Sequence, residues 1–294
     1  MKFFAKLGKC LQAAFRIKPT VVSEDPFEKG ILRLPTQMRT IVSSSASGFY
    51  KGDCWFGVPA NASYHFSTLE GVSTNSSGFY FLLGQGSSGL VEAFCSSGKC
   101  GVVKRLVIGA SSYYNGEGLD YRAVVETLSL HSFPQLYQLE LGAWVLFSNS
   151  HAMYGKLGNL SGLLGRCPSL QVLELNGHFD LTEKLNHKTL KALRIQIDDP
   201  VTAVNGGEIS QSSLTNLLSG EMPNLEELDI DLSIFAPSIT YSLPKSLFEG
   251  ERLQSLRSLK LRGNFDPMLQ AYIDSSPLAR RVSISFEQTN EEQS

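Results

Sequence analysis

A glycine-rich phrase at residues 84–89 has the spacing of a loop that could hold a dinucleotide. It reads Gly-Gln-Gly-Ser-Ser-Gly and directly follows the apolar run from Phe79 to Leu83. That chemistry needs a helix whose N-terminus faces the pyrophosphate, and an acidic residue about 20 positions further on for the ribose. The next apolar segment, Leu90 to Cys95, reads as a short β-like run, too short for such a helix, and no acidic residue lies at the required distance. We therefore interpret the phrase as a glycine-rich hairpin turn and expect no cofactor.

Two cysteines on either side of a tight turn could form a disulfide or bind a metal. Cys95 and Cys100 enclose Ser-Ser-Gly-Lys. A metal site needs about four ligands, and no second pair of Cys or His lies near them in sequence. The chain has five cysteines, an odd and sparse set that fits a reducing cytosol, so we expect two free thiols on a hairpin.

The remaining residue types give no pattern for catalysis. The five histidines are scattered without a His-Glu-x-x-His pair, and no Gly-x-Ser-x-Gly phrase is present. A catalytic triad assembled from distant residues stays open as an alternative. We expect no metal site and no enzyme activity.

The elements that position the other polar residues come from a repeated phrase, Leu-x-x-Leu-x-Leu. Its clearest copies run from Leu136 to Leu141 and from Leu170 to Leu175, each two residues after a proline. Further copies begin at Val103, Leu190, Leu225 and Leu256, and a degenerate seventh runs from Arg281 to Phe286 with Val282 as its marker residue. Each Leu-x-Leu alternates two sides, as a strand does. One such strand cannot bury its apolar side alone, so stacked neighbours are expected to bury it as a parallel sheet.

The segments between the phrases carry the spacing of helices. We predict helices over residues 119–130 and at three leucine-rich or apolar clusters: Leu157, Leu160, Leu163 and Leu164; Leu214, Leu217 and Leu218; Met268, Leu269, Tyr272 and Ile273. Pro134, Pro168 and Pro223 fall where a helix should end before the next strand. Because Leu173 and Leu193 are only 20 residues apart, the connection at 181–187 is expected to be extended or a single turn.

Long helical repeats of this kind resemble ribonuclease-inhibitor-like leucine-rich-repeat proteins. More narrowly, the chain is similar to a group of uncharacterised bacterial leucine-rich-repeat proteins, through Leu190 to Ile195, Gly206-Gly207, and Met222 to Leu232. The resemblance covers roughly residues 100–287. It implies an α/β leucine-rich-repeat solenoid, with a curved parallel sheet inside and helices outside, and it implies partner binding as the function. The short fourth unit and the degenerate last unit depart from the family's pattern.

The chain before the repeats divides into two parts. Residues 1–18 contain five basic residues and no acidic one, with apolar residues at helical spacing. They predict a basic amphipathic helix that either packs on the protein's own body or docks on a membrane or a partner. Residues 19–100 are rich in Ser, Gly and aromatic residues, with β-like runs at 49–50, 54–58, 64–69, 79–83 and 90–95. A repeat array needs an end cap, so we predict a β-rich N-terminal cap, with a small ligand-binding domain as the alternative. The repeats occupy residues 101–287, and residues 288–294 are expected to be a disordered tail.

The side chains between the leucines should line the concave face of the sheet. Its middle is predicted to be acidic and its C-terminal end basic. The acidic positions are Glu140, Glu174, Glu227, Asp229 and Asp231, relieved by Arg194; the basic ones are Lys260 and Arg262, and Asn176 and Gln196 lie among them. The first unit would add Arg105 and Val107, and the last Arg281, Ser283 and Ser285. Such a face favours a protein partner with a basic patch, unless the charges only keep an exposed sheet soluble.

Aromatic residues in the loop after Leu141 are candidate anchors for a partner. Trp144 and Tyr154 lie there, with Phe147 between them. Aromatic side chains dominate binding hot spots, although core packing of Trp144 is an equal alternative.

Composition excludes some classes of partner. The net charge of −2 argues against a nucleic-acid binder, and no apolar run of about 18 residues predicts a membrane span. We expect a cytoplasmic, non-enzymatic protein-binding module, and the concrete hypothesis is an inhibitor or immunity protein that neutralises a toxin. Two alternatives stay open. One is a ligand-binding or enzymatic N-terminal region with the repeats as a targeting arm. The other is a membrane-docked scaffold that uses the basic residues of 1–18.

Overall fold

The computed structural model describes residues 53–57, 78–83, 88–110, 120–143, 155–196, 209–232 and 240–288. Several predictions lie outside these residues: the basic helix at 1–18, the β-like runs at 49–50 and 64–69, the anchors Trp144, Phe147 and Tyr154, and the tail from residue 289 on. Gln288, which we assign to the tail from the sequence, is the last residue of a strand.

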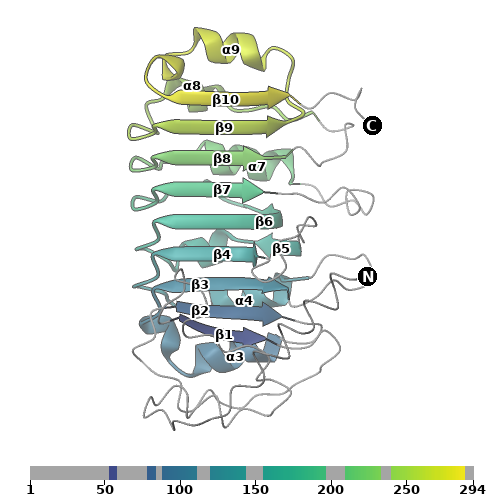
Figure 1. Ribbon diagram of the computed structural model, residues 1–294, viewed down its shortest axis with the longest axis vertical. Helices are drawn as coiled ribbons and strands as arrows, with labels where there is room; N and C mark the ends of the chain where they lie inside the picture. Colours follow the sequence, from purple (N-terminus) through teal and green to yellow (C-terminus); the bar gives the residue numbers. More distant parts are fainter. Residues whose placement is uncertain are drawn as a thin grey trace, which may run out of the picture.

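An all-parallel sheet forms the body of the protein (Figure 1). Nine strands follow one another in the order β1-β2-β3-β4-β6-β7-β8-β9-β10, and β5 (Gly155–Asn159) pairs with the end of β6 off this path. Neighbours in sequence are therefore neighbours in space. The nine strands are β1 (Asp53–Gly57), β2 (Gly78–Leu83), β3 (Arg105–Ala110), β4 (Gln138–Ala143), β6 (Val172–Asp180), β7 (Ala192–Gln196), β8 (Glu227–Asp231), β9 (Ser258–Gly263) and β10 (Ser283–Gln288).

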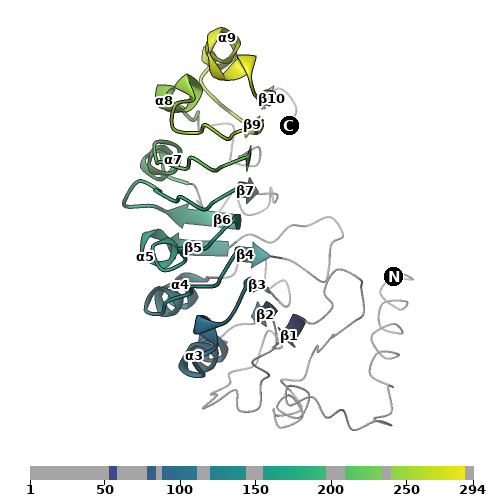
Figure 2. The same cartoon turned by 90° about the vertical axis from the view of Figure 1, so that its left-hand side faces the viewer.

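Helices alternate with the strands and lie on one side of the sheet (Figure 2). They are α3 (Ser88–Ser96), α4 (Arg122–Ser129), α5 (Ser161–Leu164), α7 (Gln211–Leu218), α8 (Lys245–Glu249) and α9 (Leu269–Ser275), with 3-10 turns η2 (Lys99–Gly101) and η3 (Leu278–Arg280). Pro134, Pro168 and Pro223 each lie between a helix and the next strand, as predicted. The short connection at 181–187 is irregular, as its length predicts.

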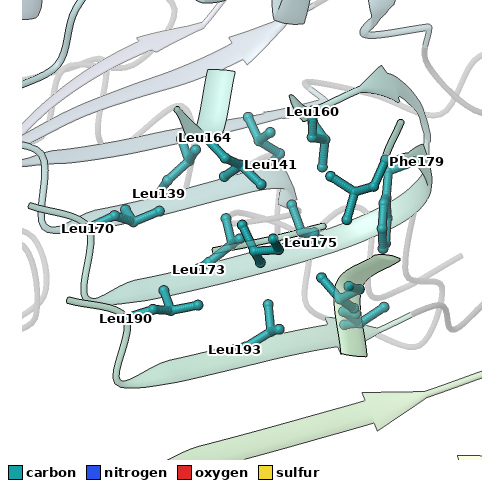
Figure 3. Packing of buried hydrophobic residues seen from close by; sticks show 14 of the residues in the cluster. Leu139, Leu141, Leu160, Leu164, Leu170, Leu173, Leu175, Phe179, Leu190 and Leu193 are labelled. Atoms are coloured by element: carbon teal, nitrogen blue, oxygen red, sulfur yellow. The ribbon is translucent and has the colours of Figure 1, made fainter. Parts of the chain in front are cut away.

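The repeated phrase aligns the core from strand to strand. Leu106, Leu139, Leu173, Leu193, Leu228 and Leu259 are successive Cα partners, and each is at most 1% exposed. Figure 3 shows how Leu139, Leu173 and Leu193 lie with Leu160, Leu164 and Phe179 in one apolar layer between sheet and helices. Burying a leucine side chain contributes about 1.5–3 kcal/mol, which makes this layer the main source of stability.

The strand starts are joined by shared carbonyl groups. The carbonyl of Lys104 accepts the N–H groups of both Tyr137 and Gln138. The carbonyls of Tyr137, Gln171, Lys191 and Glu226 each accept two N–H groups of the next strand start in the same way, at 2.7–3.1 Å from nitrogen to oxygen. One backbone geometry therefore recurs at five successive junctions.

The sheet continues across residue 100, where the sequence places the end of a separate cap. β1 and β2 pair in parallel with each other and with β3. Phe79 and Phe81 are partners of Leu106 and Ile108 and are fully buried, with the ring of Phe94 from α3 centred 5.0 and 5.2 Å from theirs. Phenylalanine thus takes the place of leucine in this unit.

The prediction of a hairpin at 84–89 with a β-like run at 90–95 is wrong. The segment from Leu90 to Cys95 lies inside the nine-residue helix α3, and β2 pairs in parallel on both sides. Val91, Phe94 and Cys95 are buried, which is the i, i+3, i+4 spacing of a helix. Residues 84–87 themselves are outside the described part of the chain.

Three details of the repeat boundaries also differ from prediction. Leu157 lies in β5 and Leu160 directly before α5, so the two leucines do not share a helix; Asn159 Oδ1 accepts the Ser161 N–H at 3.0 Å where the strand ends. Met268 is 70% exposed at the start of α9, whereas Leu269 and Ile273 are buried. In the last unit the partner of Leu259 is Ile284, and not Val282.

Candidate partner-binding face

The sheet has a face that carries no helix among the described residues, which we call the open face. Figure 2 shows every labelled helix on the other side of the strands. In each strand the residues between the leucines point to it, because successive side chains alternate sides. The sequence predicts this face to be the concave side of the sheet and the binding surface.

Strand register arranges these side chains in three rows that cross the sheet. The central row is Val107, Glu140, Glu174, Arg194, Asp229, Lys260 and Ser285. The row toward the strand starts is Arg105, Gln138, Val172, Ala192, Glu227, Ser258 and Ser283, and the row toward the strand ends is Asn176, Gln196, Asp231, Arg262 and Glu287. Neighbours in a row come from strands about 4.8 Å apart, so charged side chains in one row reach each other.

Arg194 joins three strands through two carboxylates. Its Nη1 donates to Glu174 Oε1 at 2.6 Å, and its Nη2 donates to Glu227 Oε2 at 3.3 Å. Glu174 and Arg194 are half-buried, so their contact is less screened than one in open water. The guanidinium therefore fixes two of the five predicted carboxylates.

The C-terminal end of the open face is balanced in charge, and not basic as the sequence predicts. Lys260 Nζ lies 3.6 Å from Asp229 Oδ2. Arg262 contacts Asp231 at 2.7 Å and Glu287 at 3.0 Å. Exposed ion pairs contribute at most about 1 kcal/mol each, but they cancel the local field that either sign would produce alone.

Glu140 differs from the other open-face carboxylates. It is half-buried, and no cation of the described residues forms an ion pair with it. Burial raises the pKa of its carboxyl to about 7, and the negative charge of Glu174 adds to this, while Arg105 and Arg194 act in the opposite direction. A carboxyl that exchanges its proton near neutral pH is a feature of functional sites as well as of strained structural ones.

Two open-face assignments change because the marker residue of the last phrase is Ile284, two residues after Val282. Glu287 belongs to this face and was missed, although the alternation of Ser283, Ser285 and Glu287 with Ile284 and Phe286 could have shown it. Arg281 does not belong to it. Its guanidinium instead donates to the carbonyls of Gly250, Leu253 and Gln254, which holds β10 to the preceding unit.

The cysteines lie in the core and not on a hairpin. Cys95 lies in the last turn of α3, Cys100 lies in η2, and both are buried and free, as is Cys167. A hydrogen bond between the two side chains raises the pKa of Cys95 and lowers that of Cys100. Among the described residues no group of three His, Cys, Asp or Glu side chains is placed to hold a metal ion.

Two histidines are buried, and burial lowers the pKa of each. His187 Nε2 donates to the Cys167 carbonyl at 2.9 Å, and burial lowers the pKa of His187. Burial, followed by the charge of Lys156, lowers the pKa of His178 to about 4. Both side chains are therefore neutral at pH 7.

None of the helices in the described ranges combines the length and apolar character that crossing a bilayer requires.

Comparison with known proteins gives little beyond this geometry. No family model matches the sequence, and no curated protein matches it. Among solved structures, one match is a crystal structure of a Bacteroides fragilis protein from a structural genomics consortium. The two chains are 21% identical with a TM-score of 0.44, and the match covers 66% of this chain and 53% of the other. The chain thus spans about half of that protein's length.

Proposed function

We propose that the chain is a leucine-rich-repeat solenoid that binds another protein through its open face and catalyses no reaction. The observation that carries the proposal is the set of three mostly polar rows across the sheet, two of them from β3 to β10 and the third from β6 to β10. A broad sheet face of this kind suits a protein surface, whereas a small molecule is usually bound in a concave pocket.

The ion pairs of the open face favour binding because they fix side chains in advance. Arg194 and Arg262 each hold two carboxylates, so these long side chains have less conformational entropy to lose when a partner docks. Ordering a flexible side chain at an interface costs about 0.5–1.5 kcal/mol. A partner would meet a preorganised surface.

The open face has more negative than positive side chains, which favours a partner with a positively charged surface. Six carboxylates lie on its described part, against four cations: Glu140, Glu174, Glu227, Asp229, Asp231 and Glu287, against Arg105, Arg194, Lys260 and Arg262. The partner therefore presents a basic patch. An inhibitor or immunity protein that covers the basic surface of a toxin is the concrete form of this proposal.

The test compares two pairs of arginine substitutions in the full chain. Gln196→Arg with Ser285→Arg adds bulk and positive charge to the open face at exposed positions. Ser96→Arg with Ala271→Arg adds the same groups at exposed positions of α3 and α9. Neither pair removes a described ion pair.

A partner captured from the native cytosol is purified, and its affinity for each variant is measured by calorimetry. We expect the open-face pair to weaken binding at least tenfold and the helix pair to leave it within twofold. Equal affinity for both variants would refute binding through the open face.

A further inference from the structure

The last strand of the sheet has a free edge. β10 pairs with β9 on one side, and no strand of the described residues pairs with its other side. The Ser283 N–H donates to the Arg257 carbonyl of the preceding unit at 2.9 Å. Because the backbone groups of successive residues in a strand point alternately to its two neighbours, the N–H and C=O groups of Ile284 and Phe286 point away from β9.

The carbonyl group at the start of β10 is open as well. The five shared carbonyls described above belong to the residues directly before β3, β4, β6, β7 and β8. Val282 is the equivalent residue of the last unit, and no N–H group in the described part of the chain donates to its carbonyl. The backbone at this end therefore offers the acceptor that a further parallel strand would need.

The apolar core is incompletely covered at the same edge. Leu259 and Leu261 of β9 are at most 1% exposed, whereas their partners Ile284 and Phe286 are only half-buried. The other half-buried apolar residues that pack against the core are Leu243 and Tyr272, which also lie near the C-terminal end of the sheet. One more strand would cover Ile284 and Phe286 as β10 covers the two leucines.

Nothing in β10 itself protects the edge against such pairing. Edge strands are commonly blocked by proline, lysine or a bulge, but β10 reads Ser-Ile-Ser-Phe-Glu-Gln and pairs with β9 without a register shift. In both views α9 lies further along the array than β10, on the helix side of the sheet (Figures 1 and 2). A strand added to β10 would therefore have a helix behind it.

The strand that already pairs with β10 shows which side chains its edge accepts. The two leucines of β9 lie beside Ile284 and Phe286, and Arg262 contacts the exposed carboxylate of Glu287 at 3.0 Å. A Leu-x-Leu-Arg pattern thus matches both the core side and the open-face side of β10. Residues 289–294, Thr-Asn-Glu-Glu-Gln-Ser, contain no apolar side chain and cannot supply this pattern.

We propose that the free edge of β10 binds an extended segment of a protein partner as a further parallel strand. Alternate apolar residues of the segment would pack beside Ile284 and Phe286, and a basic residue would pair with Glu287. Main-chain hydrogen bonds would give the affinity and the alternating side chains the specificity. This surface is the edge of the sheet and not its open face, so the inference goes beyond the proposed function and does not rest on it.

The first experiment uses the full chain and a synthetic peptide as the probe. The peptide, acetyl-Leu-Arg-Ser-Leu-Lys-Leu-Arg-Gly-amide, copies residues 256–263 and so carries the pattern of β9. Amide hydrogen exchange is followed by NMR with and without the peptide. We expect the exchange of the Ile284 and Phe286 N–H groups to slow at least about tenfold at saturation, and that of the Ser283 N–H, already bonded to Arg257, to change little.

Matched controls test the charge and the direction of the added strand. Glu287→Lys should weaken peptide binding about tenfold, and Glu249→Lys, the same change at an exposed position of α8, should leave it within twofold. Ser283, which precedes Ile284, points its N–H toward the preceding strand, so the serine and lysine N–H groups of a parallel peptide should face β10. N-methylation of these two residues should abolish binding, whereas N-methylation of the second and third leucines should not.

Four results would overturn the inference. Slow exchange of the Ile284 and Phe286 N–H groups in the free, dilute chain would mean that another part of the chain covers the edge. Slowing that appears with rising protein concentration, without peptide, would assign the edge to a second copy of the chain. A peptide that binds without slowing these two groups, or binds Glu287→Lys and Glu249→Lys equally well, would bind elsewhere. Loss of binding on methylating the leucines, and not the serine and lysine, would exclude a parallel strand.

Discussion

Replacing Glu140 by glutamine should stabilise the protein, and the gain should grow with pH. The folded state raises the pKa of this carboxyl from its ordinary value of 4.5 to about 7, mainly through burial. The folded protein therefore binds more protons than the unfolded chain between these two values, and its stability falls as pH rises through that window. Glutamine keeps the size and polarity of the protonated acid but cannot ionise.

The magnitude follows from the size of the shift. About 2.5 pKa units at 1.36 kcal/mol each give an upper bound of about 3.4 kcal/mol. Glu140 is only half-buried and solvent screens part of the penalty, so we expect a gain of about 1–2 kcal/mol at pH 8.5 and almost none at pH 4.5.

Urea unfolding followed by circular dichroism at pH 4.5, 6.5 and 8.5 measures this difference. Glu92→Gln removes a carboxylate at an exposed position and should leave the free energy of unfolding unchanged at all three pH values. A difference between Glu140→Gln and wild type that is independent of pH, or a less stable variant at pH 8.5, would show that the reasoning about burial and repulsion is wrong.

Three further predictions concern the rest of the fold. Stability should fall between pH 6.5 and about 4 because His178 is buried as the neutral form, and His178→Gln should reduce this fall by about 1–3 kcal/mol in melts at pH 7 and pH 5. Gly220→Ala should destabilise by about 1–3 kcal/mol, because its Cβ would collide with the backbone carbonyl of Leu185, whereas Gly101→Ala points into open space and should change little in the same urea assay. Leu173→Ala should cost about 2–5 kcal/mol through the cavity it leaves, and Val172→Ala, one residue away on the open face, less than about 1 kcal/mol; similar losses for both would contradict the assignment of faces.

The parts of the fold that follow from the sequence are those where a strong local pattern and the packing agree. Leu139 and Leu173 stand in the same place in two nearly identical phrases, so their pairing could be read directly. Phe79 and Phe81 fill the equivalent core positions in β2. They are not part of a leucine phrase, so the sequence predicts a cap for this unit and not a repeat. The segment around Val91 and Phe94 is short and apolar, and such a run fits a strand or a helix until its neighbours are known.

The open face was predictable in its residues but not in its energetics. Aligning the phrases already places Glu140 beside Glu174 and Glu174 beside Arg194, because register in a parallel sheet follows from the repeat. The raised pKa of Glu140 depends on how much water reaches it, which the spacing of leucines does not determine. The pairing of Lys260 with Asp229 likewise depends on side-chain direction. Because of it, the C-terminal end of the open face is balanced in charge, whereas the sequence predicts it to be basic.

The shared carbonyls at the strand starts have a consequence for how such a chain can change its length. At each of the five junctions between Lys104 and Ser258, one backbone carbonyl accepts the N–H groups of two consecutive residues at the start of the next strand. The connections from the end of one strand to the start of the next differ widely in length and in helix content. The strand start of a complete unit inserted between β8 and β9 would donate its two N–H groups to the carbonyl of the preceding strand start. Its own carbonyl would accept the two N–H groups of the strand start that follows. Duplication or loss of whole units therefore preserves every backbone contact at the junction, whereas a single residue added within a phrase would break the register on both sides. Units can thus be added or lost one at a time, and the open face becomes longer or shorter by one strand with each unit.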